Sequence, residues 1–156
     1  MKKAATLTER QLKQVLAHCA TRQHAARDRA IVLTSFWAGL RAKEIAALTV
    51  ADVTDADGQI KAEFVLAPEQ TKGHKARRVF LNLRLQRELG TYLKVRKTRR
   101  DCQALFPTQK AQAFSANSLC QLFLKIYAES GITGASSHSG RRSLLTALAA
   151  KGVSVR

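Results

Sequence analysis

The chain has 156 residues, of which 46% are hydrophobic and 24% are charged, so it is long enough to bury a sizeable core and is not a disordered segment. Lysine and arginine number 27 against 11 aspartate and glutamate residues, which gives a formal net charge of +16. This excess argues against an acidic small-molecule enzyme or a neutral scaffold. It favours a polyanionic partner, foremost nucleic acid, with an anionic membrane or a ribosomal surface as alternatives.

The N-terminal third of the chain predicts three helices in close succession. Thr6 and Glu9 have the spacing of a capping box, which marks the start of the first helix. The apolar face of that helix carries Leu12, Val15, Leu16 and Cys19, which recur at helical spacing. A second helix is expected over residues 24–38, with Gly39 at its C-terminal exit, and a third follows almost at once and ends near Asp52.

The pattern then changes to that of strands. Apolar and polar residues alternate over residues 60–66, which predicts a half-buried strand, and residues 78–81 predict a second short strand. Between them, the polar segment 68–76 carries Lys72, Gly73, His74 and Lys75. The two strands and their link therefore predict a β-hairpin with a basic tip.

The remainder of the chain returns to helices. Asn82 can cap one helix, and Ser115 can cap another that ends at Gly131. A last helix is expected to begin around His138 and to end before Gly152. The apolar faces of these helices are formed by Leu85, Leu89 and Tyr92, by Leu119, Leu122, Phe123 and Ile126, and by Leu144, Leu145 and Leu148. The fold class that follows is mainly α with a small antiparallel β-sheet (α+β).

Neither the cysteines nor the apolar segments point to a secreted or membrane protein. The three cysteines, Cys19, Cys102 and Cys120, form no C-x-x-C pair, so neither a disulfide scaffold nor a structural zinc site is expected. Cys19 and Cys120 lie among apolar residues and are expected to be buried. The basic N-terminus leads into polar residues rather than an apolar signal segment, and the apolar stretch 30–40 is too short to span a bilayer. We therefore expect a cytoplasmic protein with no membrane partner.

Positive charge is concentrated in the middle of the chain. Residues 71–100 include eleven lysines and arginines but one acid, Glu88. A basic cluster at the end of a predicted helix is formed by Arg96, Lys97, Arg99 and Arg100. It has two interpretations: a solvated helix end whose cations interact favourably with the helix dipole, or a contact to the DNA backbone.

Three motifs can each contact a phosphate, although each also has an ordinary structural explanation. Arg41 follows the glycine break at Gly39 and begins a helix, but it can equally be a surface residue that pairs with Glu44 one turn later. Lys72 on the hairpin tip can donate a proton to a leaving oxygen, but charge at a hairpin also blocks edge pairing. A histidine and an arginine at positions i and i+3, in His138-Ser139-Gly140-Arg141, face one way on a helix and can move a proton and grip a phosphate.

In combination, these motifs resemble the tyrosine recombinase (phage integrase) family. The resemblance rests on the order arginine, lysine, then His-x-x-Arg, each on the element that the family uses, and it covers nearly the whole chain. The matching residues are Gly39-Leu40-Arg41 with Glu44 and Leu48, Thr71-Lys72-Gly73 with Lys75, Arg77 and Val79, Leu105-Phe106-Pro107, His138 with Arg141, and the opening Thr6-Leu7-Thr8.

The resemblance implies a mainly helical catalytic domain with a small three-stranded sheet, which cleaves and rejoins DNA strands through a 3′-phosphotyrosine and uses no metal or other cofactor. By similarity, Arg41 and Arg141 stabilise the charge on the phosphate, Lys72 is the general acid for the leaving 5′-oxygen, and His138 assists proton transfer. The other residues that the resemblance implies in DNA binding are Lys43, His74, Lys75, Arg77 and Arg142. The expected partner is double-stranded DNA, on which intact relatives assemble as tetramers.

The chain also departs from the family pattern. Gly140 stands where leucine is frequent, and Arg142 stands where histidine is common. The two tyrosines, Tyr92 and Tyr127, precede the His138 motif; Tyr92 is expected in the core and Tyr127 at its edge, so neither is expected to be the nucleophile.

We therefore expect residues 1–156 to form a single, C-terminally incomplete catalytic domain that is preceded by no DNA-clamping domain. This domain is expected to be unable to cleave DNA by itself and to be able to exist as a monomer. The alternative is a non-enzymatic DNA-binding relic that acts as a regulator or decoy. Two weaker hypotheses are an RNA- or ribosome-associated protein and a tyrosine supplied by a partner protomer.

Overall fold

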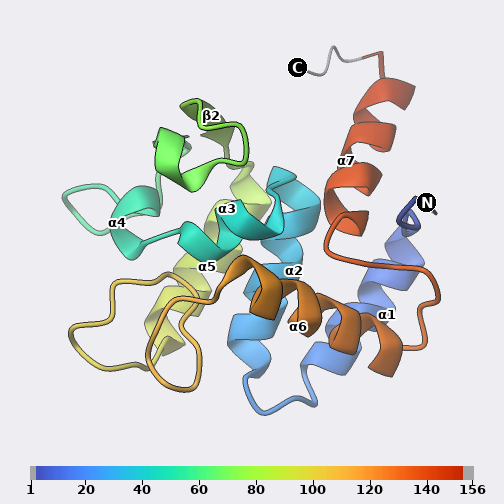
Figure 1. Cartoon of the computed structure of the whole chain (residues 1–156), viewed down its shortest axis with the longest axis horizontal. Coiled ribbons are helices and arrows are strands. Elements are labelled where there is room, and N and C mark those ends of the chain that lie inside the picture. Colours follow the sequence, from blue (N-terminus) through green and yellow to red (C-terminus); the bar gives the residue numbers. More distant parts are fainter. Residues whose placement is uncertain (1–2, 153–156) are drawn as a thin grey trace.

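The elements of the chain follow the order expected from the sequence, with helices before and after one β-hairpin along the chain (Figure 1). The computed structural model describes residues 3–152. The elements are α1 (Glu9–Cys19), α2 (Ala25–Ala38), α3 (Ala42–Ala47), α4 (Val50–Val53), β1 (Glu63–Leu66), the 3₁₀ helix η1 (Pro68–Gln70), β2 (Arg77–Phe80), α5 (Leu83–Val95), α6 (Ala116–Glu129) and α7 (Ser139–Ala150). The expected class, mainly α with a small antiparallel sheet, is confirmed.

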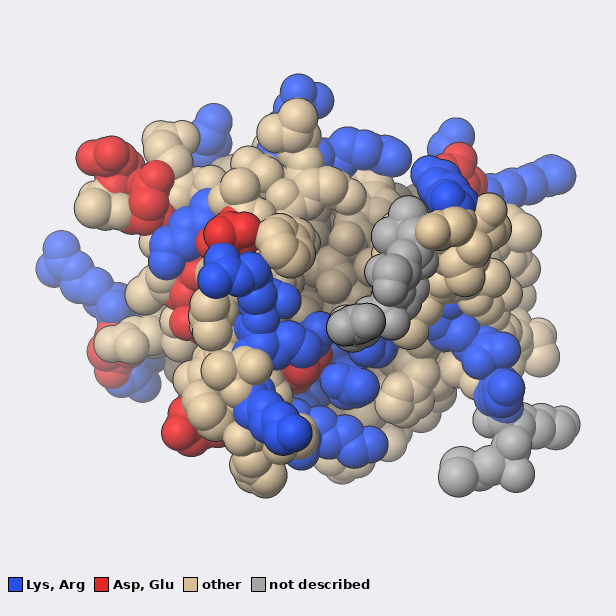
Figure 2. Space-filling view, turned by 90° about the horizontal axis from the view of Figure 1, so that it is seen from above, with Lys and Arg blue, Asp and Glu red and all other residues tan. Residues whose placement is uncertain are grey.

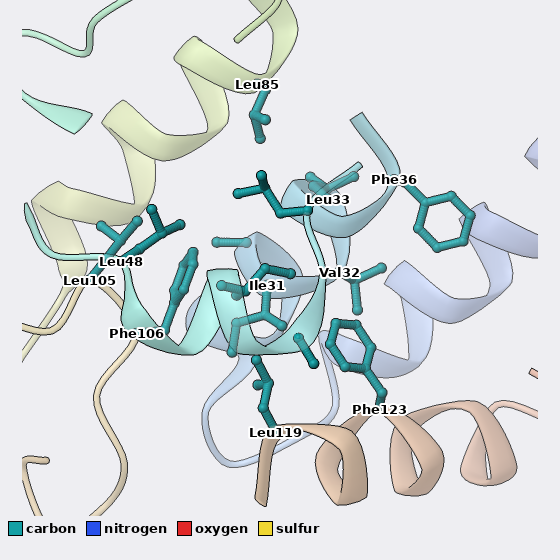
Figure 3. Packing of buried hydrophobic residues seen from close by; sticks show 14 of the residues in the cluster. Ile31, Val32, Leu33, Phe36, Leu48, Leu85, Leu105, Phe106, Leu119 and Phe123 are labelled. Carbon is teal, nitrogen blue, oxygen red and sulfur yellow. The ribbon is translucent and has the colours of Figure 1, made fainter. Parts of the chain in front are cut away.

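Helix α2 is the centre of the core. All seven residues from 30 to 36 are buried, because α1, α3, α5 and α7 pack around this helix. Figure 3 shows Ile31 and Val32 of α2 in one cluster with Leu119 and Phe123 of α6. Since burial of each such side chain contributes about 1.5–3 kcal/mol, this cluster fixes α2 firmly relative to its neighbours.

The start of α1 differs from the prediction by two residues. Thr8 is the N-cap, and it forms a capping box with Gln11, in which the Thr8 hydroxyl accepts from the Gln11 amide at 3.1 Å. The predicted box of Thr6 and Glu9 is wrong, because the residues before Thr8 form hydrogen bonds to other segments instead of a helical turn. The Leu7 amide donates to the Ser143 hydroxyl of α7 at 2.9 Å.

The single helix predicted to end near Asp52 is two helices, α3 and α4. Leu48 is buried and extended, and its carbonyl accepts a hydrogen bond from the Leu105 amide at 2.9 Å. Thr49 then caps α4 by accepting from the Asp52 amide. The chain leaves the helix at Leu48 because a distant segment competes for its backbone groups.

The hairpin is present; its first strand is shorter than the alternation predicts, and its second begins and ends one residue earlier than predicted. β1 and β2 pair antiparallel with Phe64 opposite Val79, and both of these side chains are buried. Ile60 lies outside β1, in an isolated bridge with Thr54. Within residues 3–152 the sheet has two strands, so the three-stranded sheet implied by the resemblance is not found there.

The predicted boundaries of the last three helices are confirmed. The Asn82 side chain accepts from the Leu85 amide at 2.8 Å, and Ser115 caps α6. Gly131 follows α6 with a positive φ of 79°, and α7 begins directly after His138. As expected, Cys19 is buried. Cys120, also expected to be buried, is half-buried, because it lies on the side of α6 that meets the Ser137 hydroxyl.

Candidate active site

Arg41 lies at the bend between α2 and α3. Gly39 ends α2 with a φ of 67°, a left-handed conformation that suits glycine, and Leu40 is buried beneath the bend. Arg41 is the N-cap residue of α3, and its side chain is 37% exposed. A buried leucine on one side and a helix start on the other thus hold this arginine at the surface in a fixed backbone conformation.

Glu44 is a fully buried carboxylate that joins three parts of this region. One of its oxygens accepts from the Arg41 amide at 2.8 Å and from the Arg77 guanidinium of β2. Its other oxygen lies 3.9 Å from the Arg41 guanidinium. The structural explanation of Arg41 is thus confirmed, since Arg41 begins a helix and lies beside Glu44, while its contact with a phosphate stays a prediction. A buried carboxylate that pairs with two cations holds both in place.

Arg141 of α7 reaches the same place from the other side. Its Nη1 donates to the Gly39 carbonyl at 2.7 Å, so the last helix is joined directly to the end of α2. Burial lowers the pKa of the Arg141 guanidinium, and the nearby positive charges of Arg41 and Arg77 lower it further, while Glu44 acts in the opposite direction. Two guanidiniums, those of Arg41 and Arg77, therefore lie against one buried carboxylate, and a third, that of Arg141, lies close enough to interact with all three charges, so positive charge is in excess.

The hairpin tip is exposed, and its base is fixed. The Thr71 hydroxyl is buried; it accepts from the Lys75 amide at 3.1 Å and lies 2.9 Å from the Lys75 carbonyl. The Lys43 ammonium donates to the Thr71 carbonyl at 3.2 Å, which ties the tip to α3. Lys72 and Lys75 are exposed, as is His74, which has a positive φ of 54°.

His138 and Arg142 lie at the start of α7. Both are exposed, and both line a shallow pocket together with Arg141 and Lys3. The His138 amide donates to the Ser136 hydroxyl at 3.3 Å, which fixes the backbone of the turn before the helix. The i, i+3 spacing thus brings His138 and Arg141 to one pocket, as the sequence predicts.

The predicted site residues divide into a connected group and a separate one. Arg41, Arg77 and Arg141 are connected through Glu44 and Gly39, and His138 and Arg142 border them. Within residues 3–152, no hydrogen bond or ion pair joins the side chain of Lys72, His74 or Lys75 to this group. Figure 2 looks down on the side from which β2 and α7 rise, and it shows lysines and arginines gathered around a hollow in that face.

Glu44 and Thr71 are the residues of this region whose roles the sequence did not reveal. Both belong to the motifs that match the family, but Glu44 was expected to pair with Arg41 alone, and no role was assigned to Thr71. The available signal was a lone acid three residues after the N-cap position, which is the spacing of a capping box. Thr71 gave no such signal. Its hydroxyl is buried because the hairpin turn folds over it, and no periodic pattern in the sequence predicts that burial.

Both tyrosines are core residues. Tyr92 is buried and donates to the Leu105 carbonyl at 2.8 Å, and burial raises its pKa to about 12. Tyr127, which was expected at the edge of the core, is 1% exposed because it packs against Phe123 inside the domain, and burial raises its pKa strongly. A phenol that is closed to solvent and hard to deprotonate is poorly suited to attack a phosphate.

The basic cluster after α5 has mixed roles. The Arg96 guanidinium donates to the carbonyls of Cys102, Ala104 and Leu105, so it supports the loop that follows α5. Arg99 pairs with Asp101 at the surface. Lys97 and Arg100 are exposed. Arg96 therefore has a role that neither interpretation included, since its guanidinium holds the loop that follows α5.

Two kinds of feature are absent from the part of the chain that the structure describes. Residues 3–152 include no group of three or more histidine, cysteine, aspartate or glutamate side chains arranged to hold a metal ion. No helix in that range is both long enough and apolar enough to cross a membrane.

Comparison with known proteins identifies the family to which this arrangement of residues belongs. Residues 5–156 match the family described as the Phage integrase family. No curated protein sequence matches the chain.

Solved structures match over almost the whole chain. The crystal structure of XerA recombinase has a TM-score of 0.78 and 22% identity, and the match covers 99% of this chain and 54% of that one. The Tn1549 transposon integrase in complex with a circular intermediate DNA has a TM-score of 0.75 and 17% identity, over 99% and 56% of the two chains. XerH site-specific recombinase bound to a palindromic difH substrate, a post-cleavage complex, has a TM-score of 0.69 and 22% identity, over 96% and 43%. The chain thus spans about half the length of the structures that it matches.

Proposed function

Because the chain belongs to the phage integrase family, we propose that it binds duplex DNA in the cytoplasm and contributes the phosphate-activating centre of site-specific strand cleavage and rejoining. The observation that carries this proposal is the convergence of Arg41 and Arg141 from opposite ends of the chain. Arg141 is fixed on the Gly39 carbonyl at 2.7 Å, two residues before Arg41. Two guanidiniums so placed can each donate to the non-bridging oxygens of one phosphate.

The chemistry of the site follows from where charge develops during phosphoryl transfer. As the nucleophile attacks, negative charge grows on the oxygens around phosphorus, and fixed cations stabilise it without reorganising. The nucleophile's oxygen then bonds to phosphorus, and the bond from phosphorus to the 5′-oxygen breaks. Lys72, exposed on the hairpin tip, donates the proton that the leaving 5′-oxygen needs, and His138 moves a proton to or from the attacking group.

The surrounding cations have a different role in this proposal, which is to hold the DNA backbone. His74, Lys75 and Arg142 reach solvent and are able to contact neighbouring phosphates. Lys43 and Arg77 are partly used within the protein, on the Thr71 carbonyl and on Glu44. Their contribution is therefore to orient the hairpin and the arginines while adding positive charge.

We further propose that neither Tyr92 nor Tyr127 is the nucleophile. Residues 1–156 by themselves would then bind DNA without forming a covalent link to it. The burial of Tyr92 and Tyr127 supports this. It also favours, as a second candidate function, a DNA-binding regulator or decoy that occupies recombination sites without cutting them. In either case the first measurable property is binding of duplex DNA through the Arg41 and Arg141 face.

Fluorescence anisotropy with a labelled duplex, at several salt concentrations, tests the proposal. The double variant R41Q/R141Q should weaken binding by roughly tenfold or more, and the slope of log K against log salt should fall by about two. The matched control R10Q/R87Q removes two arginines of α1 and α5 and should change binding by less than about threefold. Equal losses in both variants would mean that only the total charge matters, and would contradict a specific phosphate site.

A nicked suicide substrate tests the covalent step separately. We expect no complex that survives denaturation. Appearance of such a complex, and its loss in Y127F, would overturn the exclusion of the tyrosines. The covalent assay can fail without affecting the binding result, so the two parts of the proposal are judged independently.

A further inference from the structure

A second concave basic surface lies at the end of α2 that is remote from Arg41. It is a pocket of about 630 Å³, formed by residues 23–27, Tyr92, residues 95–99 and residues 107–111. The N-terminal end of α2, the C-terminal end of α5 and the loop after α5 meet at this place (Figure 1). Because α2 has 14 residues, the pocket is separated from the candidate active site by about 20 Å of helix.

The charge of this pocket is of one sign. The residues that line it include no aspartate or glutamate, and six of them carry or can carry positive charge: His24, Arg27, Arg96, Lys97, Arg99 and Lys110. Lys97 and Lys110 reach solvent, and within residues 3–152 their ammonium groups make no hydrogen bond or ion pair. They are therefore free to contact a ligand.

The floor of the pocket adds to the positive field. Arg27 is held by Asp28 and by the Pro107 carbonyl, and Arg96 is held by backbone carbonyls, so their charges are fixed in position. Asp28 lies behind this layer, buried and paired with both Arg22 and Arg27. A second acid, Asp101, pairs with the lining residue Arg99 at 3.0 Å, so both acids beside the pocket are already engaged with arginines.

One polar group of the lining has no partner. The Thr98 hydroxyl is shielded from solvent, and no described residue accepts or donates a hydrogen bond to it. The positive end of α2 also opens here, and the side chain of its N-cap residue, His24, does not cap the first turn. The helix end and the surrounding cations would therefore attract an anion, and the Thr98 hydroxyl lies among them without a partner of its own.

We propose that this pocket holds a backbone phosphate of a second DNA duplex, separate from the duplex at Arg41 and Arg141. The inference rests on the proposed function, because it takes DNA to be the polyanion that the chain meets. A protein partner fits less well, since Val95 is the one large hydrophobic side chain among the described lining residues that is well exposed, at 51%. Protein interfaces depend on buried apolar anchors, whereas backbone contacts to DNA depend on flexible cations.

The number of short duplexes bound per chain tests this inference. Analytical ultracentrifugation with a labelled duplex about one helical turn long should give two per chain for the unmodified protein. K97Q/K110Q should reduce this to one, and the matched control K13Q/K125Q, which removes two exposed lysines of α1 and α6, should leave it at two. R41Q/R141Q should also give one, since it removes the other site.

These outcomes separate the inference from the proposed function. If R41Q/R141Q still binds two duplexes while K97Q/K110Q binds one, the proposed function fails and the second site stands. If the unmodified chain binds one duplex and only R41Q/R141Q abolishes it, the second site is overturned. The second site is overturned as well if K13Q/K125Q loses a duplex as K97Q/K110Q does.

The source of the phosphate is tested by two further titrations. In an amide NMR experiment, inorganic phosphate should shift the signals of residues 25–27 and Thr98, and K97Q/K110Q should weaken that effect about tenfold. Shifts with inorganic phosphate but one duplex per chain would mean that the pocket takes a free anion, which overturns the DNA assignment. An RNA hairpin that displaces the second duplex at equal salt and lower concentration would overturn it as well.

Discussion

Gly140 of α7 lies directly against Ser35 of α2. A Cβ atom built at Gly140 would stand 2.7 Å from the Ser35 carbonyl carbon and 2.9 Å from the Ser35 Cβ, closer than side-chain carbons approach such atoms. The two helices therefore meet backbone to backbone at this point. Since Arg141 is the next residue, its position relative to Gly39 depends on this contact.

Replacing Gly140 should force α7 away from α2. G140A should lower the free energy of unfolding by about 1–3 kcal/mol, as overpacking of a close contact does. The matched control is G90A in α5, where a new Cβ would meet only Ile60 at 3.9 Å. Because alanine favours helix over glycine, G90A should raise stability by about 0.5–1 kcal/mol. Urea unfolding measures both, and a change of the same sign in the two variants would contradict the contact.

Removing the charge of Glu44 should destabilise the region that holds Arg41 and Arg77. E44Q keeps the shape of the side chain but leaves the Arg77 guanidinium without an anionic partner, so we expect a loss of about 2–4 kcal/mol. The control E63Q breaks the exposed pair with Arg78, and should cost less than about 1 kcal/mol. Similar losses from the two variants would show that the burial of Glu44 has no special effect.

Stability should fall at high pH, in part through Tyr92. Its pKa is raised from 10.0 to about 12 in the folded chain. A raised folded pKa gives stability that is complete below pH 10 and is lost as the pH rises toward 12. Y92F should lower stability near pH 7 by about 1 kcal/mol, through loss of the bond to the Leu105 carbonyl, and should show a smaller decline above pH 10. Unfolding curves at a series of pH values test this, and parallel declines would refute it.

Arg96 should matter for folding, and its neighbour Lys97 should not. R96Q removes the group that donates to the carbonyls of Cys102, Ala104 and Leu105, and should cost about 1–3 kcal/mol. K97Q alters an exposed side chain and should change stability by less than about 0.5 kcal/mol. Thermal unfolding of the two variants tests this. Equal losses of stability would show that Arg96 contributes no more to the fold than an exposed cation does.

The parts of the fold that local signals encode were predicted well. The caps at Asn82 and Ser115 and the glycine exit at Gly39 lie where the sequence indicated. The break at Leu48 could not be predicted, because its cause is pairing with Leu105, a residue far along the chain. Local patterns fix a helix boundary only when no distant segment competes for its backbone groups.

The candidate site divides in the same way. The residues Arg41, Lys72, His138 and Arg141 came from motifs and a family resemblance, and their roles stay proposals. The pair of the buried Glu44 and the half-buried Arg77 could not be predicted, since 33 residues separate its members and neither follows a periodic pattern. The inward turn of Arg96 was likewise hidden, because its partners are backbone carbonyls, which carry no mark in a sequence.

The enclosure of α2 has a consequence for recognition. Since residues 30–36 are buried on every side, the helix cannot tilt or slide without disrupting the core, and Gly39 and Arg41 at its end are held where folding leaves them. The entropy of ordering that bend is lost when the chain folds and not when a ligand binds. The hairpin tip, with its exposed Lys72, lacks such enclosure. This surface thus combines a rigid site at the arginines with a less constrained hairpin tip beside it.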